Sequence, residues 1–366
     1  MSLKKSDKMQ LPVFRYFPGL VGKLPFYSIS TYPTPLKHLK NFSRNHENTE
    51  IFIKRDDLSG TIYGGNKIRK LEFLIGQAKA QNSERIVTSG AAGSNHALAS
   101  AIYSKLAGFK TTLLLCDQPN SPAVRENLIA DLSCGAQIKY LNSWNTLSRC
   151  LQEENGRSKE SRSYVIPAGG SSALGTVGFV NAGLELAEQI REDVIPCPER
   201  IFVAIGTMGT AAGLLLGLRA AGLQIPLTGV RVVPSFVANE GELEALFVST
   251  NQLLHDLSPS FPIIHLKDGD ISIDHSQFGS DYGETTLEAK RVKAELLDSE
   301  QISLDMVYTG KAFSGLVSYL KGKVPEKNIL FWHTKNSRTL PWELREGDYH
   351  HLPPGLSAYF KSSDRA

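Results

Sequence analysis

The 366-residue sequence is poor in the residues from which metal centres and disulfide frameworks are built. It has only four cysteines, and none of them forms a CxxC pair, so neither a zinc site nor a disulfide framework is predicted. No HExxH spacing occurs among the nine histidines, and we expect no metal ion. Scattered thiols in a chain of this length are typical of a reducing cytosol. The cysteines are Cys116, Cys134, Cys150 and Cys197.

Long apolar runs and a large excess of one charge are also missing from the sequence. No run approaches the roughly 18 apolar residues of a membrane helix, and no apolar segment follows the opening MSLKKSDKMQ, so we expect neither a membrane span nor a secretory signal. The net charge of +3 is small and no dense basic stripe occurs, which argues against a nucleic-acid partner. With 41% apolar and 21% charged residues the composition is globular, and we expect a cytoplasmic protein.

Strand-like and helix-like segments alternate from about residue 50 onward. Short apolar runs such as IFIKRDD (51–57) and RIFVAIG (200–206) predict strands, and helical patterns of 10–15 residues separate them. This alternation predicts βαβ units, and therefore an α/β fold with a mainly parallel sheet. Residues 258–284 form a long polar stretch without a clear pattern, which is typical of a functional lid. The aromatic and charged tail after residue 336 allows no prediction.

The stretch GGNKIRKLEFLIGQAKA raises the question of whether one of its basic residues is chemically active. At a helical period of about 100° per residue, Lys67 falls on the apolar face and Lys70 at its edge, while Arg69 and Lys79 are expected on a solvated face. A buried ammonium is unfavourable unless it snorkels, or unless its amine is neutral or covalently engaged. The paired glycine ahead of Lys67 would let a ligand approach the backbone closely. Snorkelling and chemistry at Lys67 therefore both remain open.

Three predicted strands end in small polar residues just before a helix, in SGAAGSNHA, PAGGSSALG and IGTMGTAAG. In an open parallel sheet, ligands bind at the carboxyl ends of the strands. The third loop offers the backbone N–H groups of residues 207–210 and the hydroxyls of Thr207 and Thr210 at a helix N-terminus, which suits a phosphate. The alternative is a plain tight turn in which Thr210 caps the helix. In the first loop, Ser94 or Asn95 either caps the next helix or faces a ligand.

The third loop lacks the signatures of the common nucleotide sites. It is followed by no GK[ST], and its glycines do not match GxGxxG, so ATP and NAD are disfavoured. A reactive lysine together with a phosphate site indicates pyridoxal 5'-phosphate (PLP), which needs an amine for its aldehyde and an anion site for its phosphate.

Five blocks of the sequence resemble the D-cysteine desulfhydrase and 1-aminocyclopropane-1-carboxylate (ACC) deaminase family of PLP enzymes. They are, in order, GGNKIRKLEFL, SGAAGSNHA, PAGGSSALGTVGF, DYGETT and VYTGKAFSGL. The resemblance covers roughly residues 20–335. It implies the tryptophan-synthase-β fold (fold type II), with two open, twisted, mostly parallel sheets flanked by helices. It further implies a homodimer whose subunit has a large cofactor-binding domain, residues 1–71 plus 177–366, and a small domain, residues 72–176.

The resemblance also implies roles for individual residues. Lys67 matches the lysine that bonds to the cofactor aldehyde, and Tyr282 matches the active-site tyrosine over the substrate. Ser94 matches the active-site serine, and Asn95 matches the asparagine that bonds the ring hydroxyl. Further cofactor contacts are implied for Lys70 near the phosphate, for Thr334 near the pyridine nitrogen, and for the phosphate loop of Thr207, Met208, Gly209 and Thr210.

Some positions depart from the family's pattern. Relatives usually carry GSGGT in the phosphate loop, where this chain has Met208, although backbone donors survive a change of side chain. The family's HTGG block reads HTKN, so that Lys335 and Asn336 replace two glycines beside the cofactor. After SNH the chain continues ALASA, where relatives often carry Arg or Gln.

Two positions favour the desulfhydrase branch of the family over the ACC deaminases. In the deaminases a glutamate follows the active-site tyrosine, whereas here Gly283 follows Tyr282 and Glu284 comes one place later. The deaminases also tend to have leucine where Thr334 stands. A hydroxyl protonates the ring nitrogen less than a carboxylate does, and the weaker electron sink suffices when a good leaving group departs from Cβ.

We therefore expect a PLP-dependent lyase that acts on a small amino acid, D-cysteine or a related β-substituted one. It would release pyruvate, ammonia and sulfide, with Lys67 or a neighbour removing the Cα proton. Ser94 and the loop N–H groups would hold the substrate carboxylate, and Tyr282 would assist proton transfer to the leaving group. Two alternatives remain open: an ACC deaminase that yields 2-oxobutanoate and ammonia, and a non-catalytic relative that binds PLP.

Overall fold

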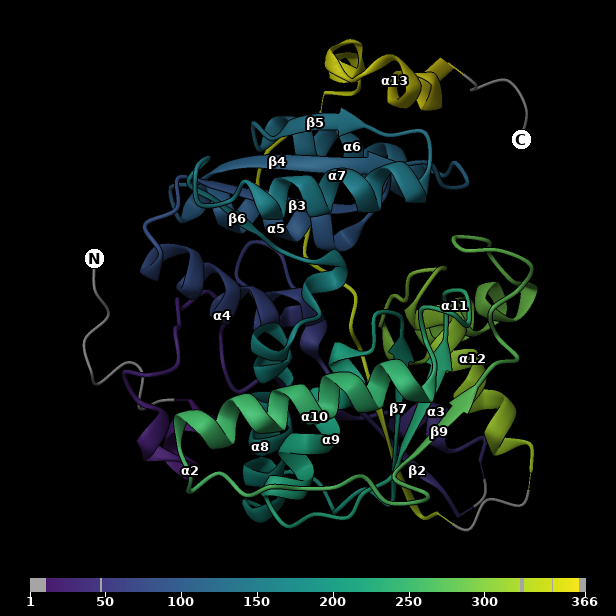
Figure 1. Cartoon of the computed structure of the whole chain (residues 1–366). Helices are drawn as coiled ribbons and strands as arrows, with labels where there is room; N and C mark the ends of the chain where they lie inside the picture. Colours follow the sequence, from purple (N-terminus) through teal and green to yellow (C-terminus); the bar gives the residue numbers. More distant parts are fainter. Residues whose placement is uncertain (1–10, 47, 323–325, 344, 362–366) are drawn as a thin grey trace. The chain divides into compact units, whose positions relative to one another are not determined.

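The chain forms two compact units, each built around one sheet (Figure 1). The computed structural model describes residues 11–46, 48–322, 326–343 and 345–361. Unit 1 contains the described parts of Met1–Leu24, Ser30–Lys70 and Ser171–Arg338, and unit 2 those of Pro25–Ile29, Leu71–Gly170 and Thr339–Ala366. The predicted α/β fold with two mostly parallel sheets is confirmed. Within the described ranges, no helix has the length and apolar character needed to cross a membrane.

The sheet of unit 1 has six strands in the order β1-β2-β10-β7-β8-β9. All neighbours pair in parallel except β1, which runs antiparallel to β2 at one edge. The central strands are almost fully buried, as their continuous apolar sequences predict. The strands are β1 (Leu36–His38), β2 (Glu50–Lys54), β7 (Arg200–Ile205), β8 (Leu227–Arg231), β9 (Ile271–Asp274) and β10 (Asn328–Trp332).

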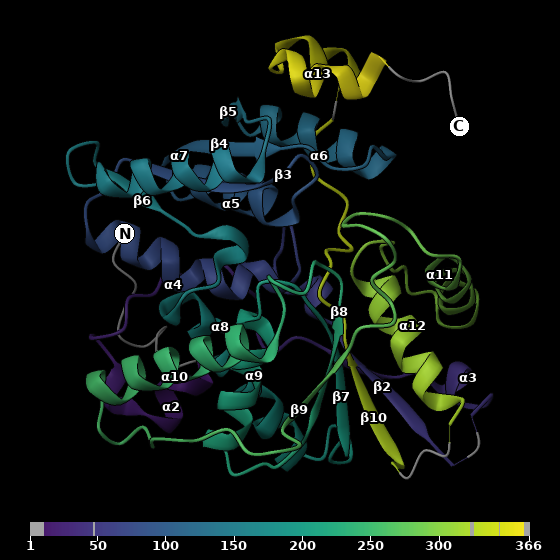
Figure 2. The same ribbon diagram turned by 45° about the vertical axis from the view of Figure 1, so that its right-hand side comes forward.

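Helices cover both faces of this sheet. Figure 2 shows α8, α9 and α10 on one face and α3, α11 and α12 on the other. The helices of unit 1 are α2 (Pro12–Tyr16), α3 (Lys40–Ser43), α8 (Ala173–Arg191), α9 (Gly209–Ala220), α10 (Glu240–Leu257), α11 (Leu287–Glu300) and α12 (Thr309–Leu320), with 3-10 turns at Pro18–Leu20 and Asp56–Leu58. The helix α4 (Asn66–Ala80) begins in unit 1 and continues into unit 2.

Unit 2 has a four-stranded parallel sheet in the order β5-β4-β3-β6. Three of its helices begin at a serine whose hydroxyl accepts a hydrogen bond from the N–H three residues on, namely Ser94, Ser121 and Ser143. The elements are β3 (Arg85–Ala91), α5 (Asn95–Leu106), β4 (Lys110–Cys116), α6 (Pro122–Ser133), β5 (Gln137–Tyr140), α7 (Trp144–Gly156) and β6 (Ser163–Val165), then 3-10 turns at Ala168–Gly170 and Glu346–His351, and α13 (Pro354–Lys361).

The C-terminal tail, for which no prediction was possible, belongs to unit 2. Its helix α13 buries Leu356 and places Gly355 against the ring of Tyr140 in β5. The expected domains placed residues 177–366 with the large domain and drew boundaries after residues 71 and 176. The compact units divide after Lys70 and Gly170 instead, and Thr339–Ala366 groups with unit 2, because the tail buries its apolar side chains there.

Arg69 was expected on a solvated face, and this prediction is wrong. Its side chain has no exposed surface and lies in an ion-pair network at the start of α4. The guanidinium donates to both carboxylate oxygens of Asp56, at 2.7 and 2.8 Å, and to those of Glu185, at 3.0 and 3.1 Å. Glu185 also pairs with the buried Lys54 at 2.6 Å. A helical-wheel argument fails here because buried charges are tolerated when they are paired and hydrogen-bonded.

The first turn of α4 packs directly against α8. A Cβ atom at Gly178 would lie only 2.2 Å from the carbonyl oxygen of Arg69. The Gly178→Ala substitution should therefore push the helices apart and lower the free energy of unfolding by about 1–3 kcal/mol. Urea denaturation followed by circular dichroism measures this. The matched variant is Gly241→Ala on exposed α10, where the nearest atom is 3.3 Å away, and it should change stability by less than about 1 kcal/mol. Equal stability of the two variants would contradict this packing.

Candidate functional site

The carboxyl edge of the sheet in unit 1 gathers three loops that carry predicted site residues. Strands β2, β10 and β7 are parallel neighbours, so their carboxyl ends lie side by side. The chain leaving β2 leads to Lys67, the chain leaving β10 to Thr334, and the chain leaving β7 to the loop 206–209. Ligands of open parallel sheets bind at this edge.

Asn66, the first residue of α4, ties these loops together. Its backbone N–H donates to the carbonyl oxygen of Thr334 at 2.9 Å, and its side-chain amide donates to the hydroxyl of Thr210 at 3.0 Å. One turn of α4 is thereby fixed to the loop after β10 and to the start of α9. Lys67 follows directly and takes its orientation from this turn.

The amine of Lys67 is poised for chemistry at mildly alkaline pH. Its side chain is only partly exposed, and burial lowers its pKa from 10.5 to about 8. Among the described residues, Lys67 forms no ion pair that would restore the charge. A lysine whose amine is partly neutral near neutral pH is a candidate nucleophile or base.

Lys70 lies one turn further along α4 and is almost completely buried. It donates to the hydroxyl of Ser171 at 2.9 Å, and that hydroxyl lies 2.7 Å from the hydroxyl of Thr207. Burial lowers the pKa of Lys70 well below 10.5, and the nearby charge of Lys67 adds to this effect. Both lysines would be stabilised as cations by an anion placed beside them.

The loop before α9 completes a small concave site that we call the cradle, formed by Lys70, Ser171, Thr176 and the residues 207–210. A Cβ atom at Gly209 would lie 2.7 Å from Ser171 Oγ, 2.9 Å from Lys70 Nζ and 3.0 Å from Thr176 Oγ1. The Thr176 hydroxyl is buried and has no hydrogen-bond partner within the described part of the chain. The cradle therefore has hydroxyl and ammonium donors around a position that a side chain at residue 209 would fill.

The backbone of this loop differs in one respect from the expected set of donors. The N–H of Gly209 donates to the carbonyl oxygen of Thr207 at 2.7 Å, so it is engaged within the loop. Thr210 and Ala211 belong to the first turn of α9, whose N–H groups have no acceptor within the helix. Met208 adopts a left-handed conformation with φ of 57°, which is unfavourable for a side chain of this kind. Met208 therefore stands in a backbone conformation that glycine adopts freely.

Tyr282 is hydrogen-bonded through its hydroxyl to that of Tyr308, the residue that precedes α12. Burial raises the pKa of Tyr308 well above 10, and proximity to Tyr282 raises it further. The loop that carries Tyr282 is anchored because Lys311 donates to the carbonyl oxygen of Phe278. Arg231 also lies over the Phe278 ring, 4.5 Å from its centre. The stretch 258–284 is therefore anchored near its end, where Tyr282 pairs with Tyr308.

Neither tyrosine is followed by a carboxylate. Gly283 follows Tyr282, and Thr309 follows Tyr308. Glu284 lies on the exposed loop, where its carboxylate accepts hydrogen bonds from the N–H and the hydroxyl of Ser280, both at 2.7 Å. Glu284 is thus engaged within its own loop.

The two residues that replace glycines of the HTGG pattern lie against the chain ahead of Lys67. Asn336 accepts a hydrogen bond from the N–H of Gly64 at 2.6 Å, and Lys335 pairs with Gly65 in an isolated antiparallel bridge. The ammonium of Lys335 lies 5.7 Å from the centre of the Tyr63 ring. These side chains secure the glycine turn rather than opening it.

Ser94 and Asn95 lie at the carboxyl end of β3 in unit 2, at the start of α5. The Ser94 hydroxyl accepts from the N–H of Ala97 at 3.2 Å, so the capping alternative is realised. The side chain of Asn95 accepts from Asn127 at 3.3 Å, and Asn127 also donates to the carbonyl oxygen of Gly93 at 2.8 Å. Capping uses an acceptor lone pair of Ser94, so its hydroxyl proton can still donate to a carboxylate.

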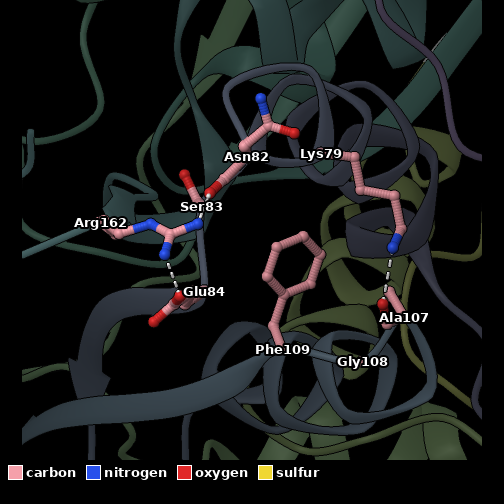
Figure 3. A pocket seen from close by; sticks show the side chains of 8 residues that line it. All are labelled: Lys79, Asn82, Ser83, Glu84, Ala107, Gly108, Phe109 and Arg162. Atoms are coloured by element: carbon pink, nitrogen blue, oxygen red, sulfur yellow. Dashed lines mark hydrogen bonds and ion pairs between the residues drawn. The ribbon is translucent and has the colours of Figure 1, made fainter.

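Figure 3 shows a surface pocket of unit 2 that is unrelated to these loops. Residues just before β3 and β4 line it, including Glu84 and Gly108, so it lies at the amino edge of the sheet. Lys79 donates there to the carbonyl oxygen of Ala107 at 2.7 Å, and Arg162 pairs with Glu84. Lys79 is exposed, as expected from the sequence.

The structure adds three residues that the sequence reasoning missed. Ser171 stands in the quoted block PAGGSSALG and Tyr308 in VYTGKAFSGL, so both blocks contained the signal. Thr176 stands in the longer block PAGGSSALGTVGF, but a threonine inside an apolar helix gives no indication that its hydroxyl lacks a partner among the described residues.

Comparisons with known proteins agree with this geometry. A family model described as "Pyridoxal-phosphate dependent enzyme" matches residues 27–335. A putative 1-aminocyclopropane-1-carboxylate deaminase of Pyrococcus horikoshii is 35% identical over 86% of this chain and 93% of its own. A D-cysteine desulfhydrase of Klebsiella pneumoniae is 33% identical over 87% of this chain and 96% of its own. A crystal structure described as an ACC deaminase homologue shares 31% identity and a TM-score of 0.75, covering 94% of this chain and 98% of the other.

The cradle fits the phosphate group of pyridoxal phosphate. It offers a buried ammonium, hydroxyls that include the unpartnered one of Thr176, and the N-terminus of α9, all of which favour an anion. The partly neutral amine of Lys67, three residues before Lys70, suits an aldehyde.

The lowered pKa of Lys67 predicts a pH profile for its reactivity. In the cofactor-free protein, labelling of this amine by trinitrobenzenesulfonate should rise with a midpoint near pH 8, as measured by mass spectrometry of the peptide. Labelling of the exposed Lys79 in the same helix serves as the control for loss of the reagent itself during the reaction. A midpoint at pH 10 or above would contradict the burial of Lys67. Since the unfolded chain binds more protons between pH 8 and 10.5, the contribution of Lys67 to stability rises with pH in that window.

The missing Cβ of Gly209 predicts a sensitive position in the cradle. The Gly209→Ala substitution should displace the Lys70 and Ser171 donors and weaken PLP binding about tenfold or more, because hydrogen bonds to charged groups contribute roughly 1.5–3 kcal/mol. Titration of cofactor absorbance measures the dissociation constant. Gly206→Ala is the matched control, since its Cβ would meet only Val233, at 3.5 Å. Equal affinities of the two variants would show that the phosphate lies elsewhere.

Proposed function

Because the chain belongs to the family of pyridoxal-phosphate dependent enzymes, we propose that it is a lyase acting on D-cysteine or a related β-substituted amino acid. The products are pyruvate, ammonia and sulfide. The observation that carries the proposal is the amine of Lys67, with its pKa lowered to about 8, one helical turn from the cradle. When bound, the cofactor supplies an aldehyde that combines with amines and a ring that accepts electrons from Cα.

In this proposal the residues keep the roles that the sequence blocks imply. Lys67 would hold the cofactor through its aldehyde in the absence of substrate. The cradle binds the phosphate, with Lys70, Thr207, Met208, Gly209 and Thr210 as predicted and Ser171 and Thr176 added. Thr334 would lie near the pyridine nitrogen, Asn95 would bond the ring hydroxyl, and Ser94 with the N-terminus of α5 would bind the substrate carboxylate.

Proton transfers are assigned to Lys67 and to the tyrosine pair. The neutral amine of Lys67 takes the proton from Cα. The bond between Cβ and sulfur then breaks, and the electron pair leaves with the sulfur. Tyr308 keeps its proton at neutral pH because its pKa is raised, so it can stabilise Tyr282 by a hydrogen bond while that hydroxyl protonates the sulfur. Water hydrolyses the released 2-aminoacrylate to pyruvate and ammonia.

The absence of a carboxylate after either tyrosine supports elimination over ring opening. With Thr334 as the residue proposed for the pyridine nitrogen, and Glu284 bonded to Ser280, the ring nitrogen would have no carboxylate partner among the described residues of these loops. Such a ring is a weaker electron sink, adequate for a thiolate that leaves readily. The second candidate, ACC deaminase, is favoured by the 35% identity to the putative deaminase of Pyrococcus horikoshii. A non-catalytic PLP-binding relative is the third, since Lys335 and Asn336 depart from the glycines of the pattern.

We further propose that the enzyme works as a cytoplasmic homodimer. The four cysteines are all free, which suits a reducing compartment. The dimer follows the family pattern implied by the sequence blocks.

A substrate panel tests the proposed reaction. The purified enzyme with PLP should release sulfide and pyruvate from D-cysteine, and much less 2-oxobutanoate from ACC. The opposite ratio would establish the deaminase alternative, and no turnover of any D- or L-amino acid would indicate the non-catalytic one. Lys67→Ala should lower the rate at least about 100-fold, because a general base contributes 10²–10⁴-fold. Lys79→Ala, in the same helix, is the control and should retain the rate.

A further inference from the structure

The C-terminal helix α13 lies outside the residues matched by the family model, which ends at residue 335, yet it is bonded to the substrate side of unit 2. We propose that α13 is a positioning element for the Ser94–Asn95 loop, acting through Tyr359, Gln118 and Gly93. This inference rests on the proposed function only for the role of that loop in binding the substrate carboxylate.

Tyr359 is the residue of α13 that makes the contact. Its hydroxyl accepts a hydrogen bond from the backbone N–H of Gln118 at 2.9 Å and donates to the carbonyl oxygen of Gln118 at 2.8 Å. The backbone carbonyl of Tyr359 accepts from the side chain of Asn120 at 2.8 Å. Helix α13 therefore bonds the loop after β4, residues 117–121, at two points: the backbone of Gln118 and the side chain of Asn120.

Gln118 carries this constraint to the neighbouring loop. Its side-chain carbonyl accepts a hydrogen bond from the N–H of Gly93 at 2.9 Å. The contact is tight, since a Cβ atom at Gly93 would lie 2.8 Å from Val124 and 3.0 Å from the side-chain nitrogen of Gln118. Strands β3 and β4 are parallel neighbours, so both loops leave the sheet at the same edge.

Gly93 immediately precedes the two predicted substrate and cofactor residues of unit 2. Its carbonyl oxygen and the side chain of Asn95 accept from the same amide, that of Asn127. Ser94 lies between them and caps α5. Fixing Gly93 from one side by Gln118 and from the other by Asn127 sets the direction in which the Ser94 hydroxyl and the first N–H groups of α5 point.

The test compares two Tyr→Phe substitutions in the full-length holoenzyme. Tyr359→Phe removes the hydroxyl that holds Gln118. Tyr140→Phe is the matched control: its hydroxyl donates to Asp117 at 2.6 Å, and the Tyr359 hydroxyl lies 3.2 Å from the other oxygen of the same carboxylate, so the control separates the effect of Asp117 from that of Gln118. Amide hydrogen exchange, read by mass spectrometry on peptides covering residues 92–98, should become about three- to tenfold faster in Tyr359→Phe and stay unchanged in Tyr140→Phe.

Kinetics separate positioning from general stabilisation of the fold. Tyr359→Phe should raise KM for D-cysteine about three- to tenfold and change kcat less than twofold, since one neutral hydrogen bond contributes roughly 0.5–1.5 kcal/mol. In a Gln118→Ala variant, Tyr359→Phe should have almost no further effect on KM. Residue 118 then lacks the side chain that bonds Gly93, so a change at Tyr359 no longer reaches the Ser94–Asn95 loop.

Two results would overturn the proposal. One is amide exchange at residues 92–98 that is equally fast in Tyr359→Phe and Tyr140→Phe. The other is full additivity of the effects of the Tyr359 and Gln118 substitutions on KM. If the wild type turns over no amino acid, the proposed function fails, while the exchange measurement still decides whether α13 positions the loop.

Discussion

The buried ion pairs of Arg69 determine the geometry of the first turn of α4, on which the candidate site of unit 1 depends. Arg69 stands between Lys67 and Lys70, and it is fixed by Asp56 from the loop after β2 and by Glu185 from α8. Breaking such a pair leaves an uncompensated charge and costs about 3–5 kcal/mol. The turn therefore has one orientation, in which the amine of Lys70 lies beside Ser171 and the start of α9. Two ammonium groups at this edge repel one another, and an anion in the cradle relieves that repulsion.

The electrostatics of this edge are consistent with the different roles that we propose for the two lysines. Lys70 is enclosed by hydroxyls and by the start of α9, so its amine has donor contacts to offer to a phosphate. Lys67 is partly exposed and has only desolvation acting on its pKa, so its amine loses its proton near pH 8. The difference follows from position along one helical turn, because residues three apart share a face but end at different depths.

Much of the fold was predictable from the sequence, because apolar periodicity sets the type of each central element. The helices 67–81 and 210–221 were predicted within one or two residues of α4 and α9. The short strand β9 was missed, since the alternation of ISID spans only four residues in a polar stretch, and the antiparallel β1 lay in a proline-rich region. The burial of Arg69 was missed because its partners, Asp56 and Glu185, are distant in sequence from one another. The tail could not be placed, because its contacts with the loop after β4 are tertiary.

The assignment of the site residues combined geometry with resemblance, and the two contribute differently. The helical wheel singled out Lys67 but left snorkelling open, while the five sequence blocks indicated the cofactor. The structure supplies the hydroxyls of Ser171 and Thr176 and the partner of Tyr282, which depend on side-chain direction and not on sequence pattern.

The central claim is that Lys67 is the amine that bonds to the cofactor. Borohydride reduction of the PLP-loaded protein, followed by digestion and mass spectrometry, identifies the lysine joined to the cofactor. The account predicts the modification on Lys67 alone. Modification of Lys70 or of a lysine outside this turn, with Lys67 unmodified, would contradict it.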